Sequence, residues 1–292
     1  MTRTLERMNI RVSILMAMLL GLTSRAASTI DSVNRHAYGA NVGWVDWRGD
    51  GANGAVIGQY FCSGYIYSAN VGWINLGAAN PADGIHYQNN SGADFGVNVD
   101  GAGNLSGYAW GANIGWITFE NGGAPRVDLL TGRLSGYAWS ANCGWISLSN
   151  AAAHVQTDAL SPGPLDSNGL PSAWELTYFH TTGVDPNADA DHDGASNGQE
   201  YLAGTNPTNA TDFLRITTAE FSRSGATNTL TWTSKPTRLY SIQEAPDLAA
   251  PAWSDIGLGL IAPGGALTTM TFSTTNAPAR FYRIRAVQPL SP

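Results

Sequence analysis

Apolar and polar residues alternate along short stretches of the N-terminal half of the chain, with turn residues between them. In GYAWSANCGWISL, at residues 136–148, the alternation places Tyr137 and Trp139 on one face of a strand and Ala138 on the other. The ANCG segment then turns the chain, because Asn and Gly accept positive φ angles most readily. WISL resumes the alternation after the turn. The pattern therefore predicts a strand, a tight turn and a second strand.

This strand-turn-strand pattern occurs four times, which is the strongest sign of internal organisation in the chain. The copies lie at residues 37–47, 64–76, 107–119 and 136–148, and their GW pairs begin at Gly43, Gly72, Gly115 and Gly144. A polar insertion, residues 80–94, precedes the third copy. Segments such as RVDLLTGRL add another strand, so each unit is expected to form a short three-stranded meander. One meander cannot bury both its faces, whereas four that stack can, and we expect a β domain over residues 29–150.

Tryptophan is concentrated in these repeats, and two interpretations of it are open. Exposed rings would be platforms on which sugar rings stack, whereas buried rings would be the core residues that every repeat needs. We favour the core, because aromatic side chains at strand positions are first of all packing groups. The residues concerned are Trp44, Trp47, Trp73, Trp110, Trp116, Trp139 and Trp145.

An acidic segment, DADHDGASNGQE at residues 189–200, fits the calcium-loop pattern DxDxDGxxxxxE without a gap. Three aspartates at loop positions 1, 3 and 5 and a glutamate at position 12 supply hard oxygen ligands, and the glycine at position 6 permits a sharp turn. These carboxylates repel one another until a divalent cation neutralises them. Because no cysteine and only one misplaced histidine accompany them, Ca²⁺ is favoured over zinc. The predicted ligands are Asp189, Asp191, Asp193, the carbonyl of Ala195, Asn197 and Glu200.

A weaker copy of this loop lies upstream in LDSNGLPSAWELTYF, where Asp166, Asn168 and Glu175 match positions 3, 5 and 12. Pro164 occupies position 1, so this half-site lacks a ligand. HTTGVDPNA, ahead of the complete loop, contains glycine and proline and cannot be the entering helix of an EF-hand. We therefore expect a loop followed by a short helix that ends at Gly204.

The two loops and their order resemble the thrombospondin type 3-like calcium repeat of bacterial proteins over residues 165–212, and the loop design is related to that of dockerin. This resemblance implies that the complete loop binds Ca²⁺; dockerin would require two complete loops. The four aromatic repeats resemble GYAWSxNxGWI repeats of exported bacterial proteins. This likeness implies that the protein is exported, and it indicates little about a biochemical activity.

From residue 213 onward the chain reads as about six short strands separated by turn-rich gaps, which predicts a β-sandwich. The LTW strand, LYSIQEAPDL and ARFYRIRAV resemble a fibronectin type III-like domain over residues 213–288, which implies spacing or cell adhesion. Trp232 is expected in the core of this domain.

The first 26 residues are expected to be a signal peptide, because basic MTRTLERMNIR precedes the 11-residue apolar run VSILMAMLLGL and small residues follow it. The apolar run is too short to span a membrane, so we expect a secreted or cell-surface bacterial protein with no transmembrane segment in its mature chain. A net charge of −7 makes nucleic acid a poor partner. In an oxidising compartment, Cys62 and Cys143 either form a disulfide or remain free buried thiols, and both possibilities stay open.

Catalytic motifs are not found in the sequence, and its five histidines are scattered, so we do not expect an enzyme. The expected fold is mainly β: a four-repeat domain of short meanders, a flexible linker over residues 151–163, a calcium module over residues 164–212 and the C-terminal sandwich. The expected function is that of an exported, extracellular calcium-binding protein with a structural or adhesive role. The alternative is a glycan-binding protein that uses the aromatic residues of the repeats, and the expected partners are a polysaccharide or a surface protein.

Overall fold

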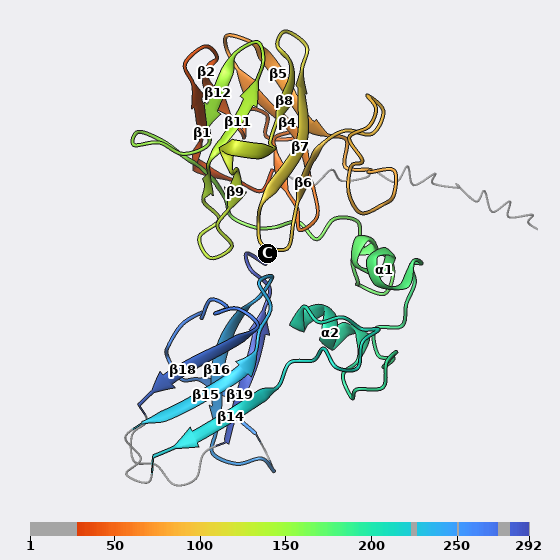
Figure 1. Cartoon of the computed structure of the whole chain (residues 1–292), viewed down its shortest axis with the longest axis vertical. Helices are drawn as coiled ribbons and strands as arrows, with labels where there is room; N and C mark the ends of the chain where they lie inside the picture. Colours follow the sequence, from red (N-terminus) through yellow and green to blue (C-terminus); the bar gives the residue numbers. More distant parts are fainter. Residues whose placement is uncertain (1–27, 223–226, 250, 274–280, 292) are drawn as a thin grey trace, which may run out of the picture.

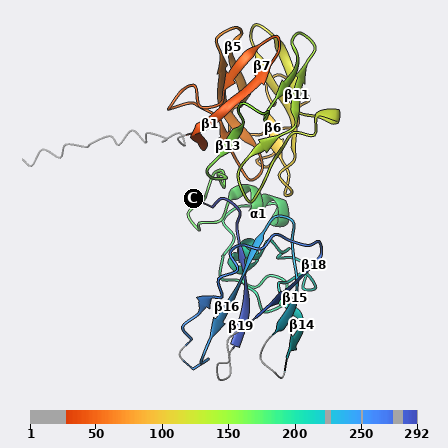
Figure 2. The ribbon, with the colours of Figure 1, turned by 90° about the vertical axis from the view of Figure 1, so that its left-hand side faces the viewer.

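The computed structural model describes residues 28–222, 227–249, 251–273 and 281–291 and is divided into three parts in chain order (Figure 1). The predicted signal peptide, residues 1–26, lies outside these ranges. A closed β domain comes first, a small module with two short helices follows, and a β-sandwich ends the chain. The helical module lies between the two β parts (Figure 2). The protein is therefore mainly β, as the sequence predicts.

Eight strands of the first domain form a closed ring, to which each repeat contributes one hairpin. Their order is β12-β11-β8-β7-β5-β4-β2-β1, and β1 pairs again with β12 at Tyr38↔Ser147, so the ring has no free edge. Closure lets four units, none of which could bury its own faces, share one interior. The strands are β1 (Ile30–Gly39), β2 (Gly43–Asp46), β4 (Cys62–Ser68), β5 (Gly72–Gly77), β7 (Leu105–Gly111), β8 (Gly115–Thr118), β11 (Tyr137–Ser140) and β12 (Gly144–Ser147).

A short additional strand pairs with the hairpin of the second repeat and another with that of the third, so these two repeats form the predicted three-stranded meanders. β3 (Val56–Ile57) pairs with β4, and β6 (Val97–Val99) pairs with β7. RVDLLTGRL instead forms a small sheet of its own, in which β9 (Arg126–Val127) pairs with β10 (Leu134–Ser135) after the 3-10 turn η1 (Asn121–Gly123).

The predicted linker, residues 151–163, differs from the expectation because it packs along the closed domain. Its strand β13 (Val155–Thr157) pairs with β1, Leu160 is buried, and the carbonyl of Ser161 accepts a hydrogen bond from the backbone N–H of Gln59. Backbone pairing and burial of this kind hold a segment in place. The helical module therefore follows directly from the first domain.

Small aliphatic side chains fill the interior of the ring. Each hairpin places one pair inside, and the pairs are Ala37↔Val45, Ile66↔Ile74, Ala109↔Ile117 and Ala138↔Ile146. The third residue of each ANxG turn is also buried and fills the end of the ring; these residues are Val42, Val71, Ile114 and Cys143. The alternation read from the sequence is thus confirmed, since every second residue of the hairpins points inward.

The interpretation of the repeat tryptophans as core residues is wrong for all but Trp47, which is buried beside Phe119. The other six are 38–51% exposed and lie on the outer face of the ring. The physical reason is space, because a ring of eight strands has an interior only wide enough for side chains to fill it. Alanine, valine and isoleucine fill the interior at the paired strand positions, Trp47, Leu76, Phe119 and Leu148 belong to the same core, and the other six tryptophans take the outer face.

The asparagines of the turns link the repeats to one another. Each Asn side chain donates from Nδ2 to the carbonyl of the buried residue in a neighbouring turn, with N···O distances of 3.0–3.2 Å. The bonds run from Asn41 to Cys143, Asn70 to Val42, Asn113 to Val71 and Asn142 to Ile114. They form a cycle that joins the first repeat to the fourth and so reinforces the closure of the sheet.

Cys62 and Cys143 do not form a disulfide. Both thiols are free and buried. Cys62 begins β4, and Cys143 fills one of the four turns. Burial raises the pKa of the Cys62 thiol to about 12, so this group behaves as a small apolar side chain.

In its described residues, the C-terminal part forms two three-stranded sheets, which correspond to the six predicted strands. One sheet has the order β14-β15-β18 and the other β17-β16-β19. Leu230, Trp232, Tyr240, Ile242, Ile261 and Phe272 form their shared core, which confirms the predicted burial of Trp232. The strands are β14 (Ile216–Phe221), β15 (Asn228–Thr233), β16 (Leu239–Ala245), β17 (Ser254–Asp255), β18 (Leu267–Phe272) and β19 (Phe281–Val287).

Candidate metal centre

The acidic loop of residues 189–200 is a compact turn that ends in a short helix, α2 (Asn197–Ala203). Ser196 caps the helix, because its hydroxyl accepts from the backbone N–H of Gln199 while the Gln199 side chain accepts from the backbone N–H of Ser196. Gly204 ends it with φ 74°. The predicted loop followed by a short helix is therefore confirmed.

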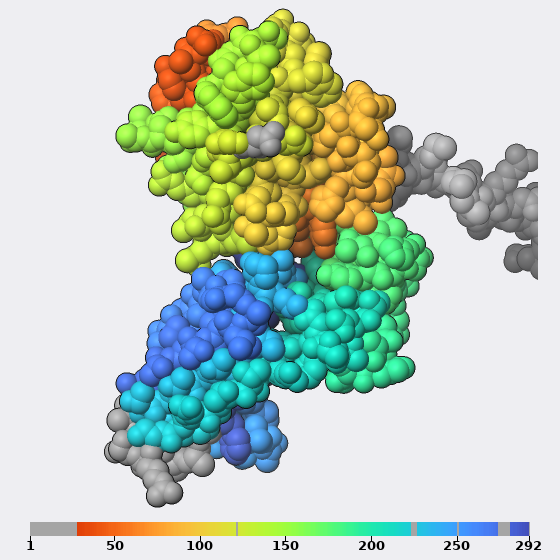
Figure 3. All heavy atoms as spheres, viewed as in Figure 1, coloured from red at the N-terminus to blue at the C-terminus, as the bar shows by residue number. Residues whose placement is uncertain are grey.

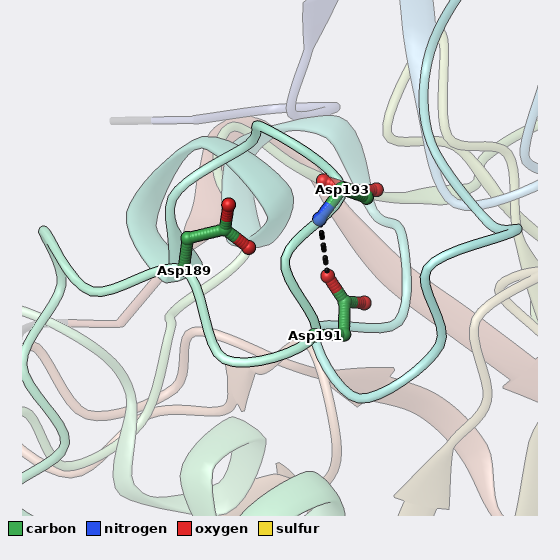
Figure 4. A group of neighbouring side chains, drawn as sticks. All are labelled: Asp189, Asp191 and Asp193. Atoms are coloured by element: carbon green, nitrogen blue, oxygen red, sulfur yellow. Dashed lines mark hydrogen bonds between the residues drawn. The ribbon is translucent and has the colours of Figure 1, made fainter.

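Backbone N–H groups of the loop turn the three aspartates toward one another (Figure 4). Asp189 accepts from the N–H of His192 at 2.8 Å, Asp191 from that of Asp193 at 3.2 Å, and Asp193 from that of Ala195 at 2.8 Å. One carboxylate oxygen from each aspartate lies within 4.8 Å of the others. At that spacing a divalent cation could be bound by all three.

Buried oxygens without a hydrogen-bond partner among the described residues provide a second, independent sign of a cation. They belong to the loop residues Asp191, Asp193, Asn197 and Glu200. Glu200 is fully buried, and its other oxygen, Oε1, accepts from the hydroxyl of Thr205 at 3.1 Å. Buried polar atoms in native proteins nearly always have a partner, so four such oxygens in one loop are available to a positively charged ligand.

A hydrogen bond to the backbone holds the side chain of Asn197, the first residue of α2. Asn197 donates from Nδ2 to the carbonyl of Asp185 at 2.9 Å, which leaves its Oδ1 free to face the loop. Ala195, the predicted carbonyl ligand, lies between Asp193 and the helix cap. Hard oxygen donors of this number and kind suit Ca²⁺, so the predicted residues fit the ion.

Burial raises the pKa of Glu200 to about 7, and the charges of Asp191, Asp193 and Asp189 add to the rise, while the hydrogen bond from Thr205 opposes it. The folded-state pKa thus lies above the unfolded value, so without metal this group stabilises the fold below about pH 4.5 and the contribution is lost as pH rises through about 7. A cation needs the carboxylate and must displace the proton.

We therefore expect calcium affinity to rise between pH 6 and pH 8, with release of about one proton per ion at pH 6 and almost none above pH 8. Calorimetric titration in two buffers of different ionisation enthalpy measures this release directly. An affinity that stays constant across this range, without proton release, would contradict the placement of Glu200 at the ion.

The upstream half-site is closed by hydrogen bonds. Asn168 donates from Nδ2 to Glu175 Oε1 at 2.8 Å and to the carbonyl of Val184 at 2.7 Å, so an amide nitrogen occupies the place where a ligand oxygen would be needed. Asp166 accepts from the backbone N–H groups of Asn168 and Gly183. One oxygen of fully buried Glu175 has no partner among the described residues, but no complete ligand set surrounds it. The residues of this half-site do not fit a second ion.

The two helices of the module join both β domains, which the sequence does not predict. Trp174 of α1 (Ser172–Phe179) and Tyr201 of α2 pack together with Leu170 and with Tyr60 of the closed domain. From the sandwich, buried Arg238 donates to the carbonyl of Leu202 at 2.8 Å and to that of Tyr201. Figure 3 shows the module in contact with both neighbours. Neither Tyr60 nor Arg238 lies in a recognisable motif, so only the fold identifies them.

A cavity of about 850 Å³ opens beside the loop. Its lining residues include Asp193 and Glu200 of the module and Arg283 and Arg285 of β19. Among the described residues, no helix has the length and hydrophobicity that a membrane span requires.

Comparisons of the chain with protein-family models, with curated proteins and with solved structures give no match. Function is therefore inferred from the chain's own residues and their geometry.

Proposed function

We propose that this chain is an exported calcium-binding protein with a structural or adhesive role outside the cell, in which the ion stiffens the joint between two β domains. The resemblance of residues 165–212 to thrombospondin type 3-like repeats supports this proposal. A weak affinity of about 10⁻⁴ to 10⁻³ M would be enough to fill such a site in an extracellular medium.

Three consecutive residues of α2 carry the proposal. Glu200 has a buried carboxylate whose pKa the charges of the loop aspartates help to raise, Tyr201 shares an apolar cluster with Tyr60 of the closed domain, and the carbonyl of Leu202 accepts from Arg238 of the sandwich. A single helical turn therefore connects the ion site to both domains. Without the ion, repulsion among the carboxylates would loosen the loop and the turn that follows it.

Small-angle scattering in millimolar calcium and in chelator tests the proposal. We expect a narrower distribution of interatomic distances with calcium, because the loaded loop holds α2 and so restricts the angle between the domains. Magnesium at the same concentration is the control for ionic strength. Superimposable scattering curves in calcium and in chelator would contradict the proposal that the ion stiffens the joint between the two β domains.

Replacing Arg238 by Met is expected to free the sandwich from α2 while leaving the ion site intact. The change removes the guanidinium hydrogen bonds to the helix carbonyls, so the calcium-loaded variant should scatter like the chelated wild type, with calcium affinity changed by less than about threefold. Arg133→Met is the matched control, because Arg133 is exposed and its side chain, among the residues that the structure describes, bonds only Ser149 of the closed domain. Unchanged scattering of the Arg238 variant would show that this contact does not set the angle.

A further inference from the structure

The outer face of the closed domain carries a belt of large aromatic side chains. Each hairpin contributes one ring from its first strand and one tryptophan from its second, and the pairs lie directly opposite each other in register. All eight side chains are 38–51% exposed. We call this set the aromatic belt: Tyr38 with Trp44, Tyr67 with Trp73, Trp110 with Trp116, and Trp139 with Trp145.

In three of the four pairs, Tyr38–Trp44, Tyr67–Trp73 and Trp110–Trp116, the two rings contact each other. Ring centroids lie 5.0 Å apart in Tyr38–Trp44 and 4.7 Å apart in Trp110–Trp116, both with edge-to-face geometry. In such a geometry the edge of one ring meets the face of the other, so other ring faces remain open to solvent. A second row, His36, Tyr65, Tyr108 and Tyr137, flanks the four second-strand tryptophans at 6.1–6.4 Å.

Stabilisation of the sheet does not by itself account for the belt. Cross-strand pairs contribute about 0.2–1 kcal/mol each, and β-branched pairs serve the same purpose without exposing so much apolar surface. Large aromatic side chains that are exposed on every hairpin of a domain are typical of a contact site. The belt lies toward the hairpin turns, which point away from the helical module and the sandwich, so neither of these parts covers it (Figure 1).

The chemistry beside the belt favours a neutral, hydroxyl-rich ligand. The second-strand positions opposite the flanking row are Asp46, Asn75, Thr118 and Ser147. Three of these four offer uncharged hydrogen-bonding groups, and Asp46 is paired with Arg35 at 3.2 Å. Aromatic faces with a few neutral polar groups suit sugar rings. The basic side chains next to these rows, Arg35 and His36, both lie against Asp46, and the net charge of −7 further opposes an anionic ligand.

The fourfold repetition of the site indicates a repeating ligand. Four similar aromatic pairs surround one rigid ring, so a polymer with a regular repeat could engage more than one of them and gain affinity through effective concentration. We propose that the aromatic belt binds a neutral polysaccharide, with sugar rings stacked on its exposed aromatic pairs. The inference deepens the adhesive role proposed above, and it rests on that proposal only for the protein's place outside the cell.

Affinity electrophoresis tests whether the aromatic belt binds a neutral polysaccharide. The full mature chain is run in gels that contain a soluble β-glucan, a galactomannan or an arabinoxylan. We expect retardation by at least one of them, weakened about 10-fold in Trp73→Ala/Trp145→Ala and abolished when Trp44 and Trp116 are also replaced. Trp253→Ala is the control, because this half-buried ring of the sandwich contacts Arg283 and lies outside the belt, and the variant should bind like the wild type. If the alanine variants fail to fold, Trp→Thr variants at the same positions keep a β-branched residue in the strand.

Several outcomes overturn the inference. These are the absence of retardation by any of the three polymers, full binding by the fourfold variant, stronger binding to phosphatidylcholine vesicles than to the polymers, and a belt-dependent dimer in sedimentation. Repeating the assay in chelator separates the two proposals, because the belt contains no predicted calcium ligand. Retardation that persists in chelator supports the belt even if calcium leaves the scattering curve unchanged.

Discussion

Replacing Glu200 by Gln is expected to lower calcium affinity on the order of 100-fold, because position 12 of the loop supplies two oxygens and one negative charge to the ion. The same change should leave the calcium-free protein at least as stable as the wild type above pH 7, since it removes a buried carboxylate whose Oε2 lacks a partner among the described residues. Calorimetric titration measures the loss of calcium binding. Thermal unfolding in chelator compares the stability of the calcium-free variant with that of the wild type.

Glu175→Gln is the matched control, because Glu175 is the equivalent residue of the half-site and is equally buried. Its Oε1 acceptor, which bonds Asn168 and Val184, is retained in the amide. Calcium affinity and a stoichiometry of one ion should therefore be unchanged. Equal loss of affinity in the two variants, or two ions bound by the wild type, would show that the half-site is a functional ligand set.

Replacing Gly136 by Ala is expected to destabilise the closed domain by at least about 3 kcal/mol, because a Cβ at this position would lie 2.3 Å from the carbonyl oxygen of Ala124. Gly136 begins the hairpin of the fourth repeat with φ 82°, and the neighbouring backbone approaches it closely. Denaturant unfolding followed by tryptophan fluorescence measures the loss.

Gly144→Ala in the same hairpin separates steric from conformational cost. Its φ of 74° is similar, yet the nearest atom to an added Cβ is 4.0 Å away, at the side chain of Asn41. Only the left-handed backbone penalty remains, which is about 1–2 kcal/mol. Equal destabilisation by the two substitutions would mean that close backbone approach does not explain the glycine of the GYAW segment.

Local patterns predicted most of the elements of this chain. The alternation and the ANxG turns predicted the four hairpins, and the spacing of the acids predicted the loop that brings Asp189, Asp191 and Asp193 together. The six strands of the sandwich and the buried position of Trp232 follow from the same reasoning. These features depend on residues close together in the sequence, so the pattern contains the information that specifies them.

The half-site was only partly readable from the sequence. Pro164 at position 1 indicated a missing ligand, but the amide nitrogen of Asn168 bonded to Glu175 and Val184 could not be foreseen. A residue type indicates which ligands are available, whereas the direction in which an amide points depends on what surrounds it.

By itself, the sequence determined where the strands and turns lie, which residues share a face of each strand, and where the acidic loop forms, because these properties follow from backbone preferences and short spacings. Only the tertiary structure decided which face of each strand is the interior and that Cys62 and Cys143 remain free thiols. It also decided which carbonyls accept hydrogen bonds from the asparagine of each turn and from Arg238. The reason is that alternation defines the two faces of a strand but does not determine which of them is buried. Closure of eight strands leaves room between the paired strands for alanine and isoleucine and assigns every repeat tryptophan except Trp47 to the outer face.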